Sequence, residues 1–397
     1  MSILAYIVFF IALCNVPRLK DEKTLLIIVS ATIFFNAIGM EWLYKALEQY
    51  TYITIRSVIF KFIALIAMFL LIHQQSDYII YGAISIFASS ASNIFNFFNV
   101  HKYISLRPVG EYNFKQHLKA VSVFFALSCA ATIYVNLDTV MLGFMKTNVD
   151  VGYYNAAVKI KTILVSIVTS LGTVLLPRAS YYVEHGLKED FYRITKKAIN
   201  FVFLVATPLM LYFMFFAKEG IFFLSGNTYG GAIVPMQIIM PTLFFIGLTN
   251  IMGMQILVPL GKENIVLYSE IVGAVVDLAI NYILIPKYAS AGAAIGTLVA
   301  EIAVWIVQYI YLRKQIKDAY KNVRYGILIL ALFLGSIASL WVKKVFSGSF
   351  IVLLNSAILF FGVYFIVLTI AKEPLIYQIE EGLSLIHISE PTRPISI

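Results

Sequence analysis

The sequence predicts an all-α membrane protein that crosses the bilayer many times. Its 397 residues are 60% hydrophobic and 13% charged, and their mean hydropathy is +0.86. Soluble domains carry roughly 25% charged residues. The apolar residues also gather in blocks near the ~20 residues that a helix needs to cross the hydrocarbon core. Cys14 and Cys129 both lie in apolar segments, so neither a disulfide nor a metal framework is expected.

About 12 apolar segments are the expected membrane helices, of a complete set of about 14. They cover residues 2–14, 24–43, 55–73, 77–98, 119–145, 152–176, 198–217, 232–258, 264–285, 289–312, 325–342 and 349–371. Residues 39–72 resemble residues 253–285, since each is the end of one span, a short loop and the next span. This repeat favours two pseudo-repeated six-helix lobes, the first truncated here, plus two accessory helices.

The predicted domains follow from this segmentation. They are a truncated N-terminal lobe of four helices at 1–118, a C-terminal lobe of six helices at 119–312, and two accessory helices at 313–382. The last fifteen residues, 383–397, read as an in-frame translation of a sequencing-library adapter and contribute nothing to the predicted fold. The first segment is short for a span, so the chain is expected to begin inside a larger protein.

The net charge of +9 is interpreted as a topology signal, and no nucleic-acid partner is expected. With the N-terminus inside, the predicted inner loops and flanks carry most of the Lys and Arg residues. Both ends are therefore expected in the cytoplasm. The sequence lacks the zinc-protease motif HExxH, the phosphate-binding GxxxxGKS/T loop and the Gly-rich dinucleotide fingerprint, so no enzyme is expected.

A polar stripe runs along the segment at 152–176. Its members follow one another at spacings of 4, 3, 4, 3 and 4, which is the spacing of one helix face. They are Asn155, Lys159, Thr162, Ser166, Thr169 and Thr173. A membrane helix with one polar face is expected to border a water-filled or solute-filled space. The stripe therefore points to transport.

Two opposite charges are expected at the same depth. Asp138 and Lys159 each lie seven residues inside the outer end of their segment, about 10 Å deep at 1.5 Å per residue. Because the two helices are antiparallel, these side chains are expected to face each other or a shared cavity. A purely structural ion pair is the alternative. Lys161 lies about 200° around the helix and is not expected on the stripe.

Other polar residues inside the spans are also candidates. Arg56 lies near the cytoplasmic mouth of its segment, and Lys61 lies five residues deeper. Glu270, Asp277 and Asn281 recur at helical spacing, and the carboxylates suit cation binding or cavity lining. Gly292 and Gly296 are expected to be helix-packing positions, with Thr297 and Glu301 nearby.

The chain resembles the bacterial oligosaccharide flippases of the polysaccharide transporter family. This family lies in the superfamily that includes the multidrug and toxic-compound extrusion transporters. The resemblance rests on the order and spacing of several motifs over residues 1 to about 380. The motifs are EWLYKALE at 41–48, YITIR at 52–56 with Lys61, LDTVMLG at 137–143, GYYNAAVK at 152–159 and LPR at 176–178, with a fitting stretch at 292–301. Compared with the family, the chain lacks the first two helices.

The resemblance implies a flippase that moves an undecaprenyl-diphosphate-linked oligosaccharide across the bacterial inner membrane by alternating access. Arg56, Lys61 and Lys159 would bind the anionic head group, since Arg and Lys suit a diphosphate. Asn155, Thr162 and Ser166 suit sugar hydroxyls. Asp138, Asp277 and Glu270 would form an ion pair or bind a coupling cation, either H+ or Na+. Expected partners are the lipid-linked substrate, membrane lipids, and the polymerase and glycosyltransferases of surface polysaccharide assembly.

Two alternatives stay open. The first is a cation-coupled multidrug exporter of the same fold, which would favour carboxylates and aromatic residues over Arg and Lys in its cavity. The second is a membrane scaffold that transports nothing and serves a glycan-assembly complex.

Overall fold

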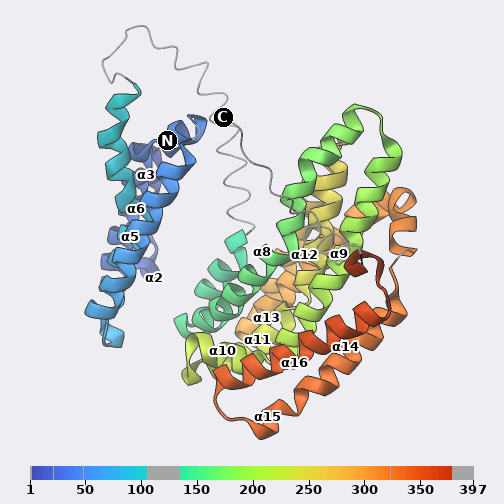
Figure 1. Ribbon diagram of the computed structural model, residues 1–397. Helices are drawn as coiled ribbons and strands as arrows, with labels where there is room; N and C mark the ends of the chain where they lie inside the picture. The colour runs from blue at the N-terminus through green and yellow to red at the C-terminus, as the bar shows by residue number, and fades with distance from the viewer. Residues whose placement is uncertain (1, 21, 48, 105–134, 322, 378–397) are drawn as a thin grey trace, which may run out of the picture. The chain divides into compact units, whose positions relative to one another are not determined.

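The structure is a computed structural model that describes residues 2–20, 22–47, 49–104, 135–321 and 323–377 (Figure 1). Every regular element within these ranges is a helix, which confirms the all-α class. The chain divides into two units, Met1–Ala120 and Val121–Ile397. The predicted span at 119–145 is described only from Val135, and Cys129 and the tail at 383–397 lie outside the described residues.

The described part of the chain contains seven helices that are long and apolar enough to cross a membrane. The number is eight if the bent pair Asn227–Ile239 and Thr242–Leu257 forms one span. The helix Glu263–Lys321 counts once, although its backbone breaks at Ala289. The multi-pass class is thus confirmed, whereas the expected total of about 12 spans stays a prediction.

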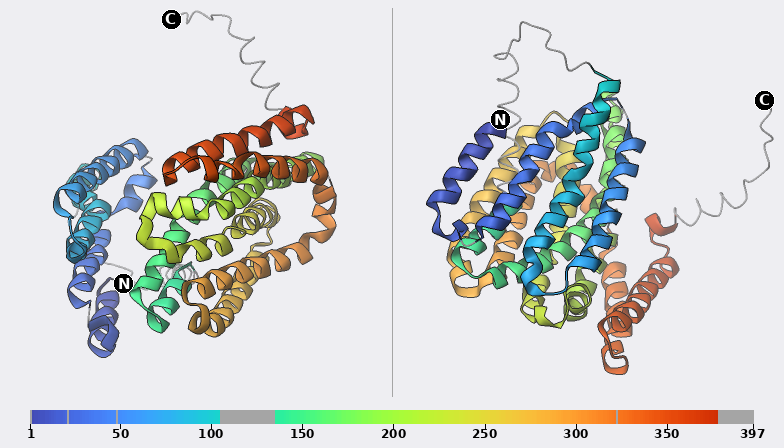
Figure 2. Two further views of the ribbon diagram at one scale, coloured as in Figure 1. Left: turned by 90° about the horizontal axis from the view of Figure 1, so that it is seen from below. Right: turned by 90° about the vertical axis from the view of Figure 1, so that its left-hand side faces the viewer.

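The core of unit 1 is formed by three helices. Helix α6 packs against both α3 and α5, and the right-hand view of Figure 2 shows the three side by side. A Cβ atom at Gly39 of α3 would meet the side chain of Asn93 of α6, so glycine permits this close approach. The α-helices in the described part of unit 1 are α1 (Ser2–Asn15), α2 (Pro17–Lys20), α3 (Lys23–Gly39), α4 (Glu41–Ala46), α5 (Tyr50–Leu71) and α6 (Tyr78–Asn99).

Side chains of unit 1 form two hydrogen bonds that join α6 to α3 and α4, one to a side chain and one to the backbone. The amide of Asn93 donates to Asn36 Oδ1 at 3.0 Å, and the hydroxyl of Tyr44 donates to the carbonyl of Asn96 at 2.8 Å. Tyr44 is fully buried and stacks on Tyr52 with a ring separation of 5.3 Å. These contacts fix the start of α5, where Tyr52 and Arg56 lie one turn apart.

Unit 2 begins, in its described part, with a hairpin of two helices. Helix α8 starts at Asn148 because Thr147 and Asp150 form a reciprocal cap of its first backbone amides. The unit contains the helix Val135–Met145, α8 (Asn148–Glu184), α9 (Lys188–Phe215), α10 (Ala217–Ser225), α11 (Ile233–Ile239), α12 (Thr242–Asn250), the π-helix Ile251–Leu257, α13 (Glu263–Lys321), α14 (Tyr325–Leu340), α15 (Val342–Val345) and α16 (Ser349–Ile370).

Helix α13 is an antiparallel hairpin. Its backbone leaves the helical region at Ala289, where φ is 47°. On either side of this break, Gly292 lies against the carbonyl of Leu284, and Gly296 lies against Asn281 and Asp277. The predicted role of both glycines in helix packing is therefore confirmed. This close packing brings Asp277 and Asn281 of the first half against the second half of α13.

Helices α14 and α16 pack against each other, as Figure 1 shows. Hydrogen bonds from tyrosine hydroxyls join α16 to α9. Tyr212 of α9 donates to the carbonyl of Leu353 at 2.8 Å and lies 2.9 Å from the Ser356 hydroxyl. Tyr364 of α16 donates to the carbonyl of Leu204 at 2.8 Å. The division of this region into a lobe and two accessory helices stays a prediction.

Candidate cation and solute site

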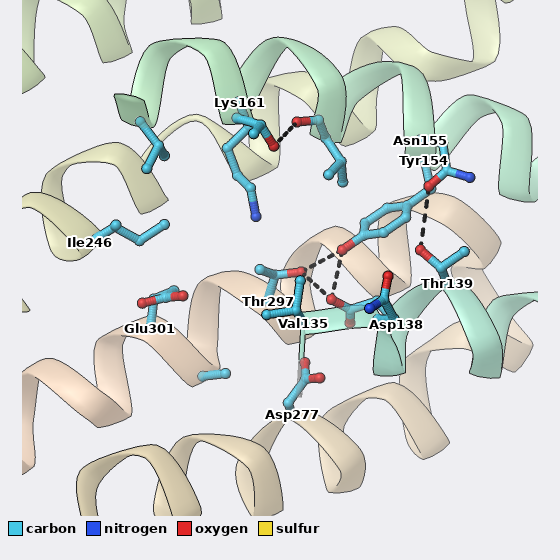
Figure 3. A pocket seen from close by; sticks show the side chains of 15 residues that line it. Val135, Asp138, Thr139, Tyr154, Asn155, Lys161, Ile246, Asp277, Thr297 and Glu301 are labelled. Atoms are coloured by element: carbon cyan, nitrogen blue, oxygen red, sulfur yellow. Dashed lines mark hydrogen bonds between the residues drawn. The ribbon is translucent and has the colours of Figure 1, made fainter. Parts of the chain in front are cut away.

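Unit 2 contains a polar cavity of about 310 Å³ inside its helical core. The helix Val135–Met145, α8, α12 and both halves of α13 contribute to its wall (Figure 3). Its ionisable and hydrogen-bonding side chains include Asp138, Tyr154, Lys161, Asp277, Thr297 and Glu301. Three carboxylates and one ammonium thus border a single space. The cavity within this unit is therefore acidic.

Asp138 is buried and accepts hydrogen bonds from three donors. The hydroxyls of Tyr154 and Thr297 donate to its Oδ2 at 2.7 and 2.9 Å, and the amide of Asn281 donates to its Oδ1 at 2.6 Å. Figure 3 shows Tyr154 and Thr297 converging on the carboxylate. Only 6% of Asp138 is exposed. These donors hold the carboxylate of Asp138 in place without a contact to Lys159.

Asp277 and Asn281 are buried beside Asp138 but are not fully satisfied. Asp277 is 3% exposed and Asn281 is 0% exposed. The Oδ1 atoms of both side chains have no hydrogen-bond donor among the described residues. The carboxyl of Asp277 also interacts directly with that of Asp138. Two neighbouring carboxylates repel each other unless a proton or a cation lies with them, so this corner of the cavity suits a cation.

Lys161 supplies the positive charge of the cavity. Its side chain extends from α8 into the space, and Glu301 lies on the facing wall formed by α13 (Figure 3). The Lys161 ammonium interacts most strongly with Glu301, and more weakly with Asp138 and Asp277. Within the described residues it forms no ion pair of 4 Å or less.

The predicted pairing of Asp138 with Lys159 is wrong. Asp138 is bound by Tyr154, Thr297 and Asn281 instead, and Lys159 does not line the cavity. Lys159 is exposed, whereas Lys161, which was not expected on the polar stripe, lies at the wall. The physical reason is helix rotation, because the wall of α8 comprises positions 154, 155, 158, 161, 162 and 165 and is centred near Val158, about 100° from Lys159.

The other predicted residues of the stripe divide into two groups. Asn155 and Thr162 line the cavity, and Asn155 accepts a hydrogen bond from the Thr139 hydroxyl at 3.3 Å. Ser166 is exposed, does not line the cavity and donates to the carbonyl of Ile163 in its own helix at 2.6 Å. Thr169 likewise donates to its own helix. The side chain of Thr173 lies outside the described ones.

Glu270 and Lys61 lie away from this cavity. Glu270 is not part of its wall, although its charge acts on Glu301. Lys61 belongs to unit 1, where its side chain is exposed. Roles of these two residues in binding stay predictions.

Arg56 is a buried cation of unit 1. It is 7% exposed, and its Nε and Nη1 atoms have no acceptor among the described residues. Its guanidinium lies 5.4 Å from the centre of the Tyr52 ring, close enough for a cation–π contact. Glu41 and Tyr44 also act electrostatically on it. Donors left open in this way suit an anion.

Sequence reasoning missed Tyr154 as a site residue and did not connect Asn281 and Thr297 with Asp138. One signal was available for Tyr154. Tyr154, Val158, Lys161 and Val165 have the same 4, 3 and 4 spacing as the stripe, displaced by one residue. No sequence signal could show which of the two rows of α8, the stripe that begins at Asn155 or the row that begins at Tyr154, faces the cavity, because both contain polar residues.

Comparisons with known proteins agree with the fold and with the resemblance. Residues 1–183 match the family model described as "Polysaccharide biosynthesis protein". The chain is 28% identical over 243 residues to an uncharacterized membrane protein of Methanocaldococcus jannaschii, an alignment that covers 61% of this chain and 48% of that protein. The chain thus spans about half the length of this relative.

Two curated bacterial relatives carry the name putative O-antigen transporter. The protein of Shigella dysenteriae is 25% identical over 286 residues, covering 70% of each chain. The protein of Escherichia coli K12 is 24% identical over 281 residues, covering 70% of this chain and 67% of its own. These relatives are named as transporters, in agreement with the expectation that the chain is no enzyme.

A solved structure shares the fold. It is the lipid II flippase MurJ in an inward closed conformation, with a TM-score of 0.69 and 17% sequence identity. The match covers 89% of this chain and 75% of the solved one. The family match, the curated relatives and the fold together confirm the resemblance of this chain to the oligosaccharide flippases of the polysaccharide transporter family.

Proposed function

We propose that the protein is a flippase for an undecaprenyl-diphosphate-linked oligosaccharide in surface polysaccharide assembly. The names of the O-antigen transporters and of the lipid II flippase support this substrate class. The observation that carries the proposal is the buried Arg56 with its unpaired nitrogens. Polymerase and glycosyltransferases of the same assembly process remain the expected protein partners.

Arg56 is suited to a lipid diphosphate for an energetic reason. A charged side chain at the centre of a membrane helix costs roughly 2.5–3.5 kcal/mol on insertion scales. Arg56 lies nearer the end of its segment, but its guanidinium is buried in the protein and for the same reason needs a partner or water. The described partners of Arg56 leave Nε and Nη1 without acceptors. These two donors lie on different edges of the planar guanidinium, so each can donate to a different oxygen of a charged diphosphate. In the proposed mechanism two lobes alternate around the head group, while the lipid tail stays in the bilayer.

A coupling cation would be held by Asp138, Asp277, Asn281 and Thr297. Its ligands would be carboxylate, amide and hydroxyl oxygens, which suit a hard cation such as Na+. A proton shared by Asp138 and Asp277 would still leave Asn281 Oδ1 without a partner. We therefore propose Na+ rather than H+. The bound ion would supply the positive charge that two adjacent carboxylates require.

The test is a leaflet-translocation assay on the full-length protein in proteoliposomes, with a fluorescent undecaprenyl-diphosphate-linked oligosaccharide. We expect the variant Arg56→Ala to translocate the lipid at least tenfold more slowly, because the head group loses its charge-assisted hydrogen bonds to the guanidinium. Arg193→Ala is the matched control, since Arg193 is exposed and pairs with Asp190 on α9. Translocation by Arg56→Ala at the wild-type rate would refute the proposal.

The acidic cavity of unit 2 favours a second candidate, the cation-coupled multidrug exporter. Asp138, Asp277 and Glu301 have the charge sign that an organic cation would require. The two candidates differ in the substrate that the protein moves. Na+-driven efflux of a cationic dye from proteoliposomes, with no translocation of the lipid-linked oligosaccharide, would decide for the exporter.

A further inference from the structure

Lys161 has a feature that the proposed function does not use. It is the cationic residue of the cavity wall in a space bordered by Asp138, Asp277 and Glu301. Its ammonium points into the space rather than into a tight ion pair (Figure 3). A positive charge in the same cavity as a cation site must repel the ion that binds there.

We infer that Lys161 sets the cation selectivity of this cavity by acting as a tethered competitor of the bound ion. The inference rests on the proposed cation site at Asp138 and Asp277. The ammonium is attracted by the same carboxylates that would hold the ion, since Asp138 and Asp277 both act on it after Glu301. Lys161 therefore lowers the affinity of the site for every metal cation.

The effect depends on the charge of the ion, and this makes Lys161 a specificity-determining residue. Coulomb repulsion is proportional to the product of the two charges. If loss of the Lys161 charge raises Na+ affinity by a given factor, Ca2+ affinity rises by about the square of that factor. Without Lys161, three carboxylates would face a cavity that also offers amide and hydroxyl oxygens, which are typical ligands of Ca2+.

Substitution of Lys161 is expected to change the Na+ and Ca2+ affinities together, with the Ca2+ factor about the square of the Na+ factor. At an effective dielectric constant of about 20, unit charges within about 12 Å of each other repel strongly enough to change an affinity at least tenfold. We therefore expect Lys161→Met to raise Na+ affinity at least tenfold and Ca2+ affinity at least hundredfold. Lys161→Arg keeps the charge and is expected to keep the wild-type preference between the two ions. Lys188→Met is the control, because Lys188 is an exposed residue of α9 outside the cavity.

A second pair of variants protects the test against misfolding. Lys161→Met leaves Glu301 without the cation that acts on it most strongly. Glu301→Gln and the double variant K161M/E301Q avoid this, because neither leaves Glu301 charged. Because Glu301→Gln and K161M/E301Q differ only at position 161, the difference between their ion affinities measures the effect of the Lys161 charge alone. The double variant is expected to bind Na+ at least tenfold and Ca2+ at least hundredfold more tightly than Glu301→Gln alone.

The experiment measures the thermal unfolding midpoint of the purified full-length protein during titration with NaCl or CaCl2, with choline chloride holding ionic strength constant. Affinities follow from the stabilisation of the folded state by the ion. Two comparisons test Lys161: Lys161→Met against the wild type, and K161M/E301Q against Glu301→Gln. If the wild type responds to Na+ but neither comparison shows a change in Na+ or Ca2+ affinity, the role of Lys161 is refuted while the cation site stands. If the wild type responds to neither ion, the proposed cation site itself fails, and the role of Lys161 fails with it. A gain in both affinities, larger for Ca2+, supports the inference.

Discussion

The substitution Gly296→Ala tests whether the close packing of the α13 hairpin shapes the cation site. A Cβ atom at position 296 would lie 2.2 Å from Asn281 Oδ1 and 3.0 Å from Asp277 Oδ1. An ordinary contact between carbon and oxygen is about 3.3 Å or longer. The methyl group must therefore displace the Asn281 side chain by about 1 Å. Asn281 Oδ1 and Asp277 Oδ1 are the two oxygens that lack donors and are proposed to bind the ion.

Two opposing contributions determine the stability of this variant. Overpacking of a buried position costs about 1–3 kcal/mol, whereas replacing a helical glycine by alanine contributes about 0.8–1 kcal/mol of stability. The net destabilisation is therefore modest, about 0–2 kcal/mol. Loss of one well-placed oxygen ligand is expected to lower Na+ affinity at least tenfold, which is about 1.4 kcal/mol.

The control for Gly296→Ala is Gly362→Ala, in the middle of α16. A Cβ atom at Gly362 would meet no atom within 4 Å, so this variant should keep wild-type Na+ affinity and gain stability. Both quantities come from thermal unfolding of the full-length protein in an NaCl titration. If Gly296→Ala binds Na+ as tightly as Gly362→Ala, Asn281 and Asp277 do not hold the ion.

Three further predictions concern single contacts. Tyr212→Phe removes two hydrogen bonds that join α9 to α16, including the one near Ser356, and should cost about 1–3 kcal/mol in the free energy of unfolding, measured by thermal or denaturant unfolding. Tyr154→Phe removes a donor from Asp138 and should weaken Na+ binding several-fold in an NaCl-dependent thermal unfolding titration; a wild-type response would show that Tyr154 does not organise the site. Thr147→Ala removes the cap at the start of α8 and should cost about 1 kcal/mol, with increased hydrogen exchange confined to the first turn as the check.

The sequence predicted the helical class and the main spans well, because lipid imposes a strong rule on composition and length. The broken helix α13 is an instructive case. The sequence indicated separate segments at 264–285 and 289–312, and the backbone breaks at Ala289, between them. The packing role of Gly292 and Gly296 was also predictable, since close helix approach in a membrane requires small residues.

The details of the site were not predictable in the same way. Polar spacing located α8 as the helix beside the cavity, but helix rotation decides whether Lys159 or Lys161 enters it. A rotation by one position is about 100°, and both lines of α8 have polar members. The pairing of Asp138 likewise depends on Asn281 and Thr297, which are more than 140 residues away in the chain. Only tertiary packing brings them together.

Among these buried polar groups, those whose atoms all have hydrogen-bond partners suit a structural role, and those with unpaired atoms suit a binding role. Asp138 has three donors, so removal of any one donor leaves a less stable buried carboxylate. Asp277, Asn281 and Arg56 keep atoms without a partner among the described residues, although burying such atoms costs free energy. A ligand would recover this cost. Substitutions at Asp277 and Arg56 should therefore change ligand binding more than stability. Substitutions at Tyr154, Thr297 and Asn281, which donate to Asp138, should change both.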